Sequence, residues 1–412
     1  MIISMVPRDT YVLVDGVLDE GLPFVASYLE NQISRSIIIT DNNGKIHYPN
    51  INRSAFRIDD AFVQIPVPFV KKEYYYQDQS NSLYYRIEYK GSHAFVVVKK
   101  LPKELLCQAI SILREARLAL KCYFAKVNKN KKEFEKKLVE YLFLKSTDSI
   151  NDVIRLSERE LDPGRHYLVL LMEVEQNREI DWQLLCSYAC EYFKRKRIDG
   201  ISVYWRNYLL VLIPALREDI LGKYLESLNQ KDVKKFKEII ENKFNIITSL
   251  GISQTYPLEK LHKSFEKARV ALTLPRLMEK MKFIQYFSEL GIYSFVFSQS
   301  LEKIKSYCLK NLGQLIEQDN DTDCSLLPTI RTLLDSGFSM KSTADSLHIH
   351  VNTLYYRINK IEQLLGIDLS KMSTQVELYI AIKVWDTLKL NGFVYPDETD
   401  HQIQLESTRQ SV

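Results

Sequence analysis

The sequence predicts a multidomain α+β protein, and three observations support this prediction. The chain has 412 residues, which corresponds to two to four domains at roughly 100 to 200 residues per domain. Short β-like runs fill much of residues 1–100, helical spacing begins at residue 101, and four amphipathic helices follow one another in 325–392. Hydrophobic residues make up 46% of the chain and charged residues 26%, values typical of globular proteins that exclude a disordered or collagen-like chain.

Residues 1–100 are predicted to form a small α+β module. Residues 22–33 repeat apolar side chains at helical spacing. The runs 37–40 and 45–48 flank Asp41-Asn42-Asn43-Gly44, so we expect a β-hairpin closed by an Asn-Gly turn, with two later strands around Gly91. The six tyrosines between positions 74 and 89 fit a ligand pocket, but aromatic residues also favour strands, and this second interpretation is the stronger one.

Residues 101–145 are predicted to form a helical connector. Eleven positions step by four and three, and nine of them are apolar, as in the seam of a parallel helix pair. These positions are 106, 110, 113, 117, 120, 124, 127, 131, 134, 138 and 141. A helix packed on its own domain is the alternative, because Val127-Asn128-Lys129-Asn130 could interrupt the repeat. We prefer a dimerising coiled coil, with the lysine-rich stretch 126–137 as a solvated face.

Residues 146–300 are predicted to form an α/β domain. Its elements follow the order β-α-β-β-α-β-α-β, from a strand at 167–174 to a strand at 282–286, which suits a sheet with helices on one face. The basic run Lys194-Arg195-Lys196-Arg197 lies at the end of a helix, where cations offset the helix dipole, so we prefer a structural role for it.

Residues 325–392 carry the most informative pattern. Ser339 can cap a helix of about two turns, 340–347. The tight turn His348-Ile349-His350 then leads into a longer helix, 351–365, which a glycine ends. A short helix, a tight turn and a longer helix make a helix-turn-helix, whose second helix enters the DNA major groove.

One face of the longer helix is predicted to read DNA. At 100° per residue, the apolar side chains gather on one side: Val351, Leu354, Tyr355, Ile358, Ile361 and Leu365. Amide, hydroxyl and cationic side chains gather on the other side, where asparagine can pair with adenine, arginine with guanine, and lysine or tyrosine with phosphate. We predict that the DNA-contacting residues are His350, Asn352, Thr353, Tyr356, Arg357 and Lys360.

The charge of this region leaves an alternative open. Residues 325–392 hold seven Lys and Arg against six Asp and Glu. The net charge of the whole chain is only +4, too little to indicate a nucleic-acid binder by itself. An ordinary helical bundle is therefore the alternative. If the region binds DNA, one copy binds weakly and two copies are needed.

Neither a metal site nor a membrane segment is predicted. The six cysteines include no Cys-x-x-Cys pair, which argues against a disulfide framework or a zinc ribbon, and His348 with His350 makes only an incomplete zinc site. The N-terminus lacks the pattern of a secretory signal, and no apolar stretch reaches the ~20 residues of a membrane helix. We therefore expect a cytoplasmic protein without cofactor, metal or catalytic residues, and with a disordered tail at 393–412.

The helix-turn-helix resembles that of the PucR/CdaR family of bacterial transcription regulators, which is related to that of Fis. The resemblance rests on residues 343–358 and 361–369, and above all on His350-Val351-Asn352-Thr353-Leu354 followed by Tyr356-Arg357. A generic helix-turn-helix often has glycine where His348 stands, but this family commonly has histidine there.

The middle region resembles the GGDEF-like domain of the same family, through Leu250-Gly251-Ile252-Ser253 and residues 261–272. Cyclases of that fold need a glycine pair and acidic Mg²⁺ ligands at the tip of the central hairpin, whereas the tip here is Trp205-Arg206-Asn207-Tyr208. The resemblance therefore implies a degenerate GGDEF-like domain at 146–300 that is not an enzyme. The module at 1–100 is weakly similar to PAS or GAF sensors, which implies a ligand-sensing domain.

Taken together, the resemblance implies a DNA-binding transcriptional regulator. It would sense a small-molecule metabolite, bind double-stranded promoter or operator DNA as a homodimer or higher homo-oligomer, and control a metabolic operon. The alternative is a nucleotide-binding or cyclase-like enzyme that works through the middle domain. A third hypothesis is a scaffold whose helical end binds protein.

Overall fold

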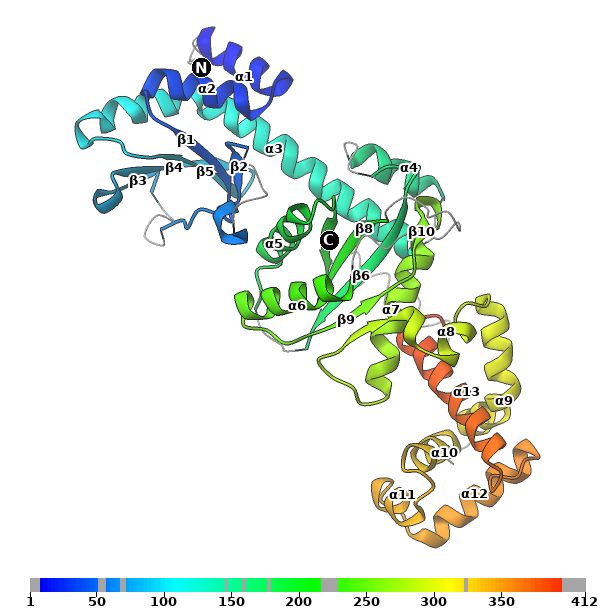
Figure 1. The fold of residues 1–412 in the computed structure, drawn as a ribbon. Coiled ribbons are helices and arrows are strands. Elements are labelled where there is room, and N and C mark those ends of the chain that lie inside the picture. Colours follow the sequence, from blue (N-terminus) through cyan, green and yellow to red (C-terminus); the bar gives the residue numbers. More distant parts are fainter. Residues whose placement is uncertain are drawn as a thin grey trace. The chain divides into compact units, whose positions relative to one another are not determined.

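The computed structural model of the chain describes residues 8–50, 57–66, 72–144, 147–157, 161–175, 179–215, 229–321 and 325–394 (Figure 1). The chain divides into two compact units. The first comprises Met1–Leu168, Glu173–Ile247 and Thr255–His262, and the second comprises Val169–Met172, Thr248–Gln254 and Lys263–Val412. The tail that we predict to be disordered lies outside the described residues, apart from its first two positions.

The first unit begins with an α+β module, as predicted. Its elements are α1 (Arg8–Asp19), α2 (Leu22–Ile33), β1 (Ile37–Asp41), β2 (Ile46–Tyr48), η1 (Ile58–Ala61), β3 (Tyr74–Gln77), η3 (Asp78–Ser80), β4 (Ser82–Tyr89) and β5 (Ser92–Val98). The strands form one antiparallel sheet in the order β2-β1-β5-β4-β3. The predicted helix at 22–33, the hairpin and the strands β4 and β5 are confirmed, and α1 and β3 are additional.

The two faces of this sheet are covered differently. Side chains alternate between the faces of a strand, so Tyr84 and Tyr85 point to opposite sides. Tyr85 is fully buried in a core that includes side chains of α1, α2 and the long helix α3 (Leu106–Leu144). On the other face, Tyr84 belongs to a smaller apolar cluster against which Val63 and Ile65 pack. Both of these tyrosines therefore serve strand packing.

The helix α3 follows η4 (Lys103–Leu105) and is continuous for 39 residues, without a break at 127–130. Leu113, Leu120 and Leu138, three of the positions that we expected to face a second copy, are fully buried within one chain. The first half of α3 packs on α1, α2 and the sheet, and α3 also contacts α4 (Thr147–Leu156). The repeat is thus explained by packing inside one copy, which was the alternative to a dimerising coiled coil.

The middle region is built around a six-stranded sheet. Its elements are β6 (His166–Val174), α5 (Trp182–Arg195), β7 (Ile201–Trp205), β8 (Tyr208–Pro214), α6 (Gln230–Phe244), β9 (Thr248–Ile252), β10 (Tyr256–Pro257), η5 (Leu258–Lys260), α7 (Leu261–Leu277) and β11 (Ile284–Tyr286). The strand order is β11-β9-β6-β8-β7, and β10 pairs with β6. The predicted order of elements is confirmed, except that β10 is an additional short strand between β9 and α7. Because β6, β8 and β9 are buried at almost every position, both faces of the sheet are covered, and the prediction of helices on one face is wrong.

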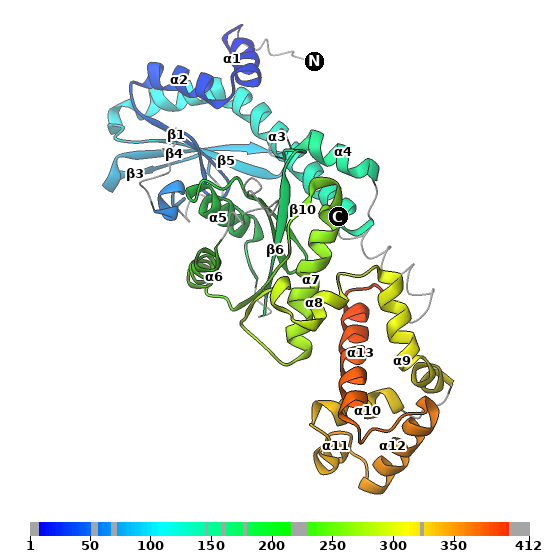
Figure 2. The same cartoon turned by 45° about the vertical axis from the view of Figure 1, so that its right-hand side comes forward.

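The second unit ends in a group of helices around one apolar core (Figure 2). They are η6 (Phe287–Glu289), α8 (Ile292–Val296), α9 (Leu301–Asp321), α10 (Leu326–Asp335), α11 (Met340–Ser346), α12 (Val351–Leu365) and α13 (Met372–Leu390). The helices α9 and α13 lie side by side. The core also takes in Val270 and Leu274 of α7. The sequence pattern predicts α10 to α13, whereas α9 is additional.

Within the first unit, the N-terminal module contacts α5 and α6 through η1. Lys243 Nζ on α6 donates to Asp59 Oδ1 at 2.6 Å, and the Tyr188 hydroxyl on α5 donates to the same oxygen. The Phe62 ring stacks on Tyr188 with 4.4 Å between centroids. These contacts tie the connection between β2 and β3 to two helices of the middle region.

Gly251 allows α7 to approach β9 closely, and this predicts the effect of a methyl group there. A Cβ at 251 would lie 2.3 Å from the Ala268 carbonyl oxygen and 2.7 Å from Leu272 N. Gly251→Ala is therefore expected to lower the free energy of unfolding by about 1–3 kcal/mol, because backbone atoms must move.

Gly313→Ala on α9 is the control, since no described atom lies within 4 Å of the Cβ that alanine would add. Helix propensity predicts that this variant gains about 0.5–1 kcal/mol in the free energy of unfolding. Urea unfolding followed by circular dichroism measures both, and a Gly251→Ala protein as stable as the wild type would contradict the close packing.

Asp59→Asn is expected to weaken the η1 contact in a pH-dependent way. The hydrogen bond from Lys243, followed by that from Tyr188, lowers the pKa of Asp59. The contribution of the carboxylate to stability is therefore complete above its unfolded pKa of about 4 and is lost as the pH falls through the folded pKa. Because this side chain is 64% exposed, the contribution at neutral pH is on the order of 1 kcal/mol or less. The thermal unfolding midpoints of wild type and variant should differ at neutral pH and converge below about pH 4.

The matched control for Asp59→Asn is Asp78→Asn. Asp78 pairs with Lys103 at 3.0 Å inside the N-terminal module, and both side chains are more than two-thirds exposed. This control is expected to leave the midpoint nearly unchanged across the same pH range. A difference between Asp59→Asn and wild type that stays constant down to about pH 3 would rule out the carboxylate contact as its cause.

Candidate nucleic-acid interface

The helices α11 and α12 meet at a turn whose backbone explains the sequence there. His348 has a φ of 53°, in the left-handed region where glycine is usual and histidine is among the enriched side chains. The Ile349 N–H donates to the carbonyl of Ala344 at 3.0 Å and closes the end of α11. Histidine at 348 therefore occupies the conformation that glycine supplies in other turns of this kind.

His350 begins α12 as its N-cap. Its Nδ1 accepts a hydrogen bond from the Asn352 N–H at 3.2 Å, so the ring satisfies one of the N–H groups that the first turn leaves free. At the other end, Gly366 has a φ of 62° and its N–H donates to the carbonyl of Glu362, a common left-handed helix end. Both ends of the longer helix thus lie where the sequence predicts them.

The inner face of α12 anchors it in the helical core. Leu354 and Ile361 are fully buried, Ile358 is 7% exposed, and Ala344 of α11 is 2% exposed. Tyr355 differs from the prediction, because half of its surface is exposed. At 100° per residue it lies about 80° from the centre of the buried stripe, where a large ring reaches solvent.

Four of the predicted DNA contacts are exposed at the start of α12. His350, Asn352, Thr353 and Tyr356 are all exposed, and Tyr356 has 66% of its surface accessible. Lys360 follows one turn later and is partly buried. Residues three and four apart share one side of a helix, so these side chains form one polar face at the N-terminal half of α12, where a recognition helix contacts base edges.

Arg357 lies apart from this group. Its Nη1 donates to Thr329 Oγ1 on α10 at 3.1 Å, and the side chain is partly buried. Thr329 itself is fully buried and donates to the Ser325 carbonyl at 2.7 Å. Sequence reasoning did not identify Thr329, because a threonine inside an apolar stripe gives no sign of its partner. In this arrangement Arg357 joins α12 to α10.

Some of the positive charge of this region is neutralised inside the chain. Arg331 binds Asp386 through two hydrogen bonds of 2.9 and 2.6 Å, and Lys383 Nζ lies 2.8 Å from Asp335 Oδ1. Both pairs involve basic residues counted in the predicted charge of residues 325–392. The exposed face at the start of α12 therefore consists mainly of uncharged polar side chains.

The tip of the central hairpin in the middle region carries aromatic and basic side chains. The Arg206 guanidinium lies 4.6 Å from the centre of the Trp205 ring, which stacks with Tyr208.

In the part of the chain that the structure describes, no group of three or more His, Cys, Asp or Glu side chains could hold a metal ion. None of the described helices is both long and apolar enough to cross a membrane.

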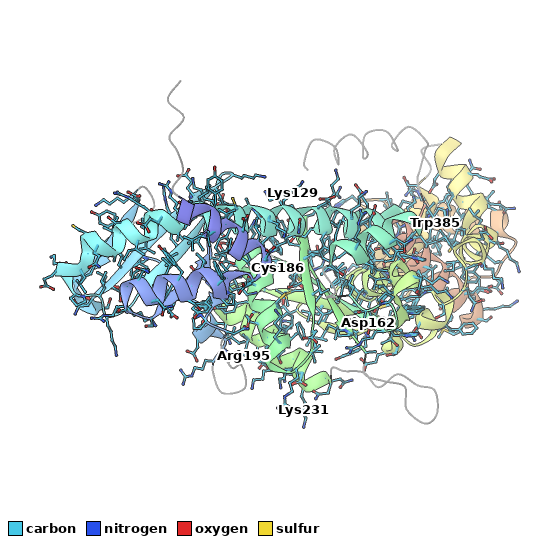
Figure 3. All side chains as sticks on the ribbon, turned by 90° about the horizontal axis from the view of Figure 1, so that it is seen from above. Lys129, Asp162, Cys186, Arg195, Lys231 and Trp385 are labelled. Carbon is cyan, nitrogen blue, oxygen red and sulfur yellow. The ribbon has the colours of Figure 1, made fainter. Side chains whose placement is uncertain are left out.

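The neighbouring cysteines of α5 have packing roles. Cys186, which is labelled in Figure 3, is buried, and burial raises the pKa of its thiol. Cys190 Sγ lies 2.8 Å from Ser202 Oγ, which in turn donates to the Cys186 carbonyl at 2.7 Å. A thiol with a raised pKa is a poor nucleophile, which agrees with a packing role for Cys186.

Two family models match the chain. The PucR C-terminal helix-turn-helix domain matches residues 326–384, and the GGDEF-like domain matches residues 148–274. The first match covers α10 to α12 and most of α13. The second runs from α4 into α7.

Several characterised proteins are similar to the chain. The proline-responsive transcriptional activator PutR of Bacillus subtilis is 24% identical over 294 residues, which cover 69% of this chain and 71% of that protein. The DNA-binding transcriptional activator AdeR of the same organism is 30% identical over 30% of this chain and 29% of its own length. The purine catabolism regulatory protein of B. subtilis is 28% identical over 37% of this chain and 29% of its own length. The chain thus spans less than a third of the last two relatives.

A solved structure also shows a likeness. The crystal structure of a regulator of polyketide synthase expression from Bifidobacterium adolescentis is 15% identical, and the match covers 63% of this chain and 93% of that one with a TM-score of 0.29. The family assignment rests on the sequence matches, in which a GGDEF-like domain precedes a C-terminal helix-turn-helix. The similar curated proteins that have a described role are regulators. The chain thus carries a PucR C-terminal helix-turn-helix domain preceded by a GGDEF-like domain, and its homologues are transcriptional regulators such as PutR.

Proposed function

We propose that the chain regulates transcription by binding promoter or operator DNA through the exposed polar face of α12. The observation that supports this most directly is the exposure of Asn352, Thr353 and Tyr356 on a helix whose opposite side is locked in a core. Asparagine pairs with adenine edges and threonine contacts thymine methyl groups, while tyrosine reaches phosphate oxygens. His350 and Lys360 flank this face, and Arg357 joins it if DNA draws its guanidinium away from Thr329.

The chain is proposed to act as a homodimer or higher homo-oligomer. Phosphate contacts dominate affinity for DNA, and the helix-turn-helix region has almost balanced charges with two of its cations paired internally. One copy therefore gains little from electrostatics. Two copies on two half-sites reach a useful affinity without extra charge on each.

Ligand sensing is assigned by this proposal to residues 1–100, with 101–145 as connector, 146–300 as the GGDEF-like domain and 325–392 as the DNA-binding domain. A cytoplasmic small-molecule metabolite that binds one arrangement of the N-terminal module more tightly shifts the population of that arrangement. The η1 contact with α5, together with Lys45 paired to buried Glu191 at 3.5 Å, offers a route to the middle region. The regulated genes then belong to a metabolic operon.

A cyclase-like or nucleotide-binding enzyme is the competing function. The hairpin tip argues against it, because Trp205, Arg206 and Tyr208 stand where Mg²⁺ ligands are needed. Titration calorimetry with GTP and Mg²⁺ separates the two functions. No heat above dilution is expected from the full chain, whereas a saturable exchange of heat near one nucleotide per chain would favour the enzyme.

Asn352→Ala tests the proposed DNA contact. The loss of a base contact is expected to weaken binding to the selected DNA by about 1–3 kcal/mol, or roughly 5- to 150-fold. Gln363→Ala is the matched control, because it removes an exposed amide from the C-terminal half of the same helix. Gel-shift titration on a duplex that the wild-type chain selects from a random pool measures both. Equal affinities of wild type and Asn352→Ala would remove this residue from the interface.

A further inference from the structure

Lys383 is a buried cation on the apolar side of α13. Its side chain is only 4% exposed, and neighbouring positions on the helix, Ile382, Val384 and Trp385, are buried apolar residues. An ammonium group in such surroundings is unfavourable unless it is paired and hydrogen-bonded. An apolar side chain of similar length would fill the same space, so the partners of Lys383 indicate what the charge is for.

The ammonium of Lys383 joins three helices. It donates to Asp335 Oδ2 at 3.0 Å, on the last residue of α10, and to the Leu277 carbonyl at 3.1 Å, on the last residue of α7. Carbonyls at the C-terminus of a helix lack intrahelical partners and carry partial negative charge. Lys383 therefore connects the end of the last long helix of the GGDEF-like domain with a helix of the DNA-binding domain.

A second contact fixes the other end of the α7–α13 pair. Arg269 on α7 donates to the Asn391 carbonyl at 2.6 Å, and Thr273 Oγ1 donates to Asn391 Oδ1 at 3.4 Å. The pairs Lys383 with Leu277 and Asn391 with Arg269 are eight residues apart on each helix, in opposite directions. Because the two contacts have the same spacing along both helices, they fix the axial position and the rotation of α13 relative to α7.

The recognition helix is tied to this junction through α10. Arg331 on α10 binds Asp386 on α13 through two hydrogen bonds, a planar geometry that fixes direction as well as distance. Arg357 on α12 donates to Thr329 on α10. Polar contacts thus continue from α7 through α13 and α10 to α12.

We propose that Lys383 is a positioning residue that sets the orientation of the helix-turn-helix relative to α7. In a dimer, this orientation decides how far apart and at what angle the two copies of α12 meet DNA. Buried polar contacts favour one arrangement over others that bury the same apolar surface. The proposal rests on the DNA-binding function proposed above.

The test compares binding to one half-site with binding to two. The wild-type protein is first used to select duplexes from a random pool. Its affinity is then measured for three duplexes: the selected site, a single half-site, and a site whose two halves are moved apart by about five base pairs, which is half a helical turn. Lys383→Met is expected to bind the single half-site within about twofold of wild type. Its preference for the selected spacing is expected to fall by about tenfold or more, because the second half-site is no longer reached without distortion.

Lys389→Met is the matched control. Lys389 lies on the same helix, is exposed, and has its ammonium 5.7 Å from the centre of the Trp385 ring. This variant is expected to keep the wild-type affinities for all three duplexes. A Lys383→Met protein that also keeps the full spacing preference would overturn the proposal, and so would a wild type that binds shifted and selected sites equally well.

Asp335→Asn keeps the proposal testable if Lys383→Met does not fold. The Asp335 side chain is 41% exposed, so its replacement leaves the core intact and removes the negative charge beside Lys383 while an acceptor oxygen remains. A partial loss of spacing preference with unchanged half-site affinity is expected, and an unchanged preference would count against the proposal. If wild type selects no duplex at all, the DNA-binding function itself fails, which is a separate outcome.

Discussion

The helix-turn-helix depends on the burial of its apolar side chains against α9 and α13. The helix α11 has seven residues and α12 has fifteen, and helices of this length are marginal in water by themselves. Leu354 and Ile361 lie in one core with Leu312 of α9 and Leu388 of α13. The exposed face of α12 contributes little to this stability. Its side chains are therefore free to be selected for what they bind.

Apolar burial of this kind fixes which faces meet, but it leaves their exact alignment loosely specified. Apolar cores tolerate repacking as long as volume and pattern are kept. Directional contacts supply the missing alignment, and in this chain they occur where substructures join. Arg331 with Asp386 aligns α10 on α13, and Lys243 with Asp59 aligns η1 on α6. In both units, therefore, apolar burial holds the elements together and directional polar contacts align them.

Much of the fold is predictable because its signals are local. The Asn-Gly hairpin, the helix at 22–33 and the limits of α12 follow from turn residues and periodicity within short windows. The predicted contacts at His350, Asn352, Thr353 and Tyr356 share one exposed face for the same reason. The helix α9 is not among the predicted helices, although local signals for it exist: Ser300 caps its first turn by accepting a hydrogen bond from the Lys303 N–H at 3.4 Å, and Ile304, Cys308, Leu312 and Leu315 form a buried stripe at helical spacing.

The remaining differences come from partners that are distant in sequence. A heptad repeat in α3 shows that one face is buried, but the spacing cannot say whether a second copy or the chain's own sheet buries it. Arg357 lies at the margin of the α12 stripe, and its orientation toward α10 depends on Thr329, a residue 28 positions earlier. Contacts of this kind become visible only when the tertiary structure is known.

The low charge of the chain connects these points to DNA recognition. The helix-turn-helix region holds seven cations against six acidic residues, so nonspecific attraction to phosphate is weak for each copy. Under the proposed function, discrimination comes from polar contacts on α12 and from the presentation of two copies of that helix at one spacing. The first depends on a few exposed side chains, whereas the second depends on buried contacts far from DNA. The two proposals together make the residues that align α13 on α7 as much a part of recognition as the residues proposed to touch bases.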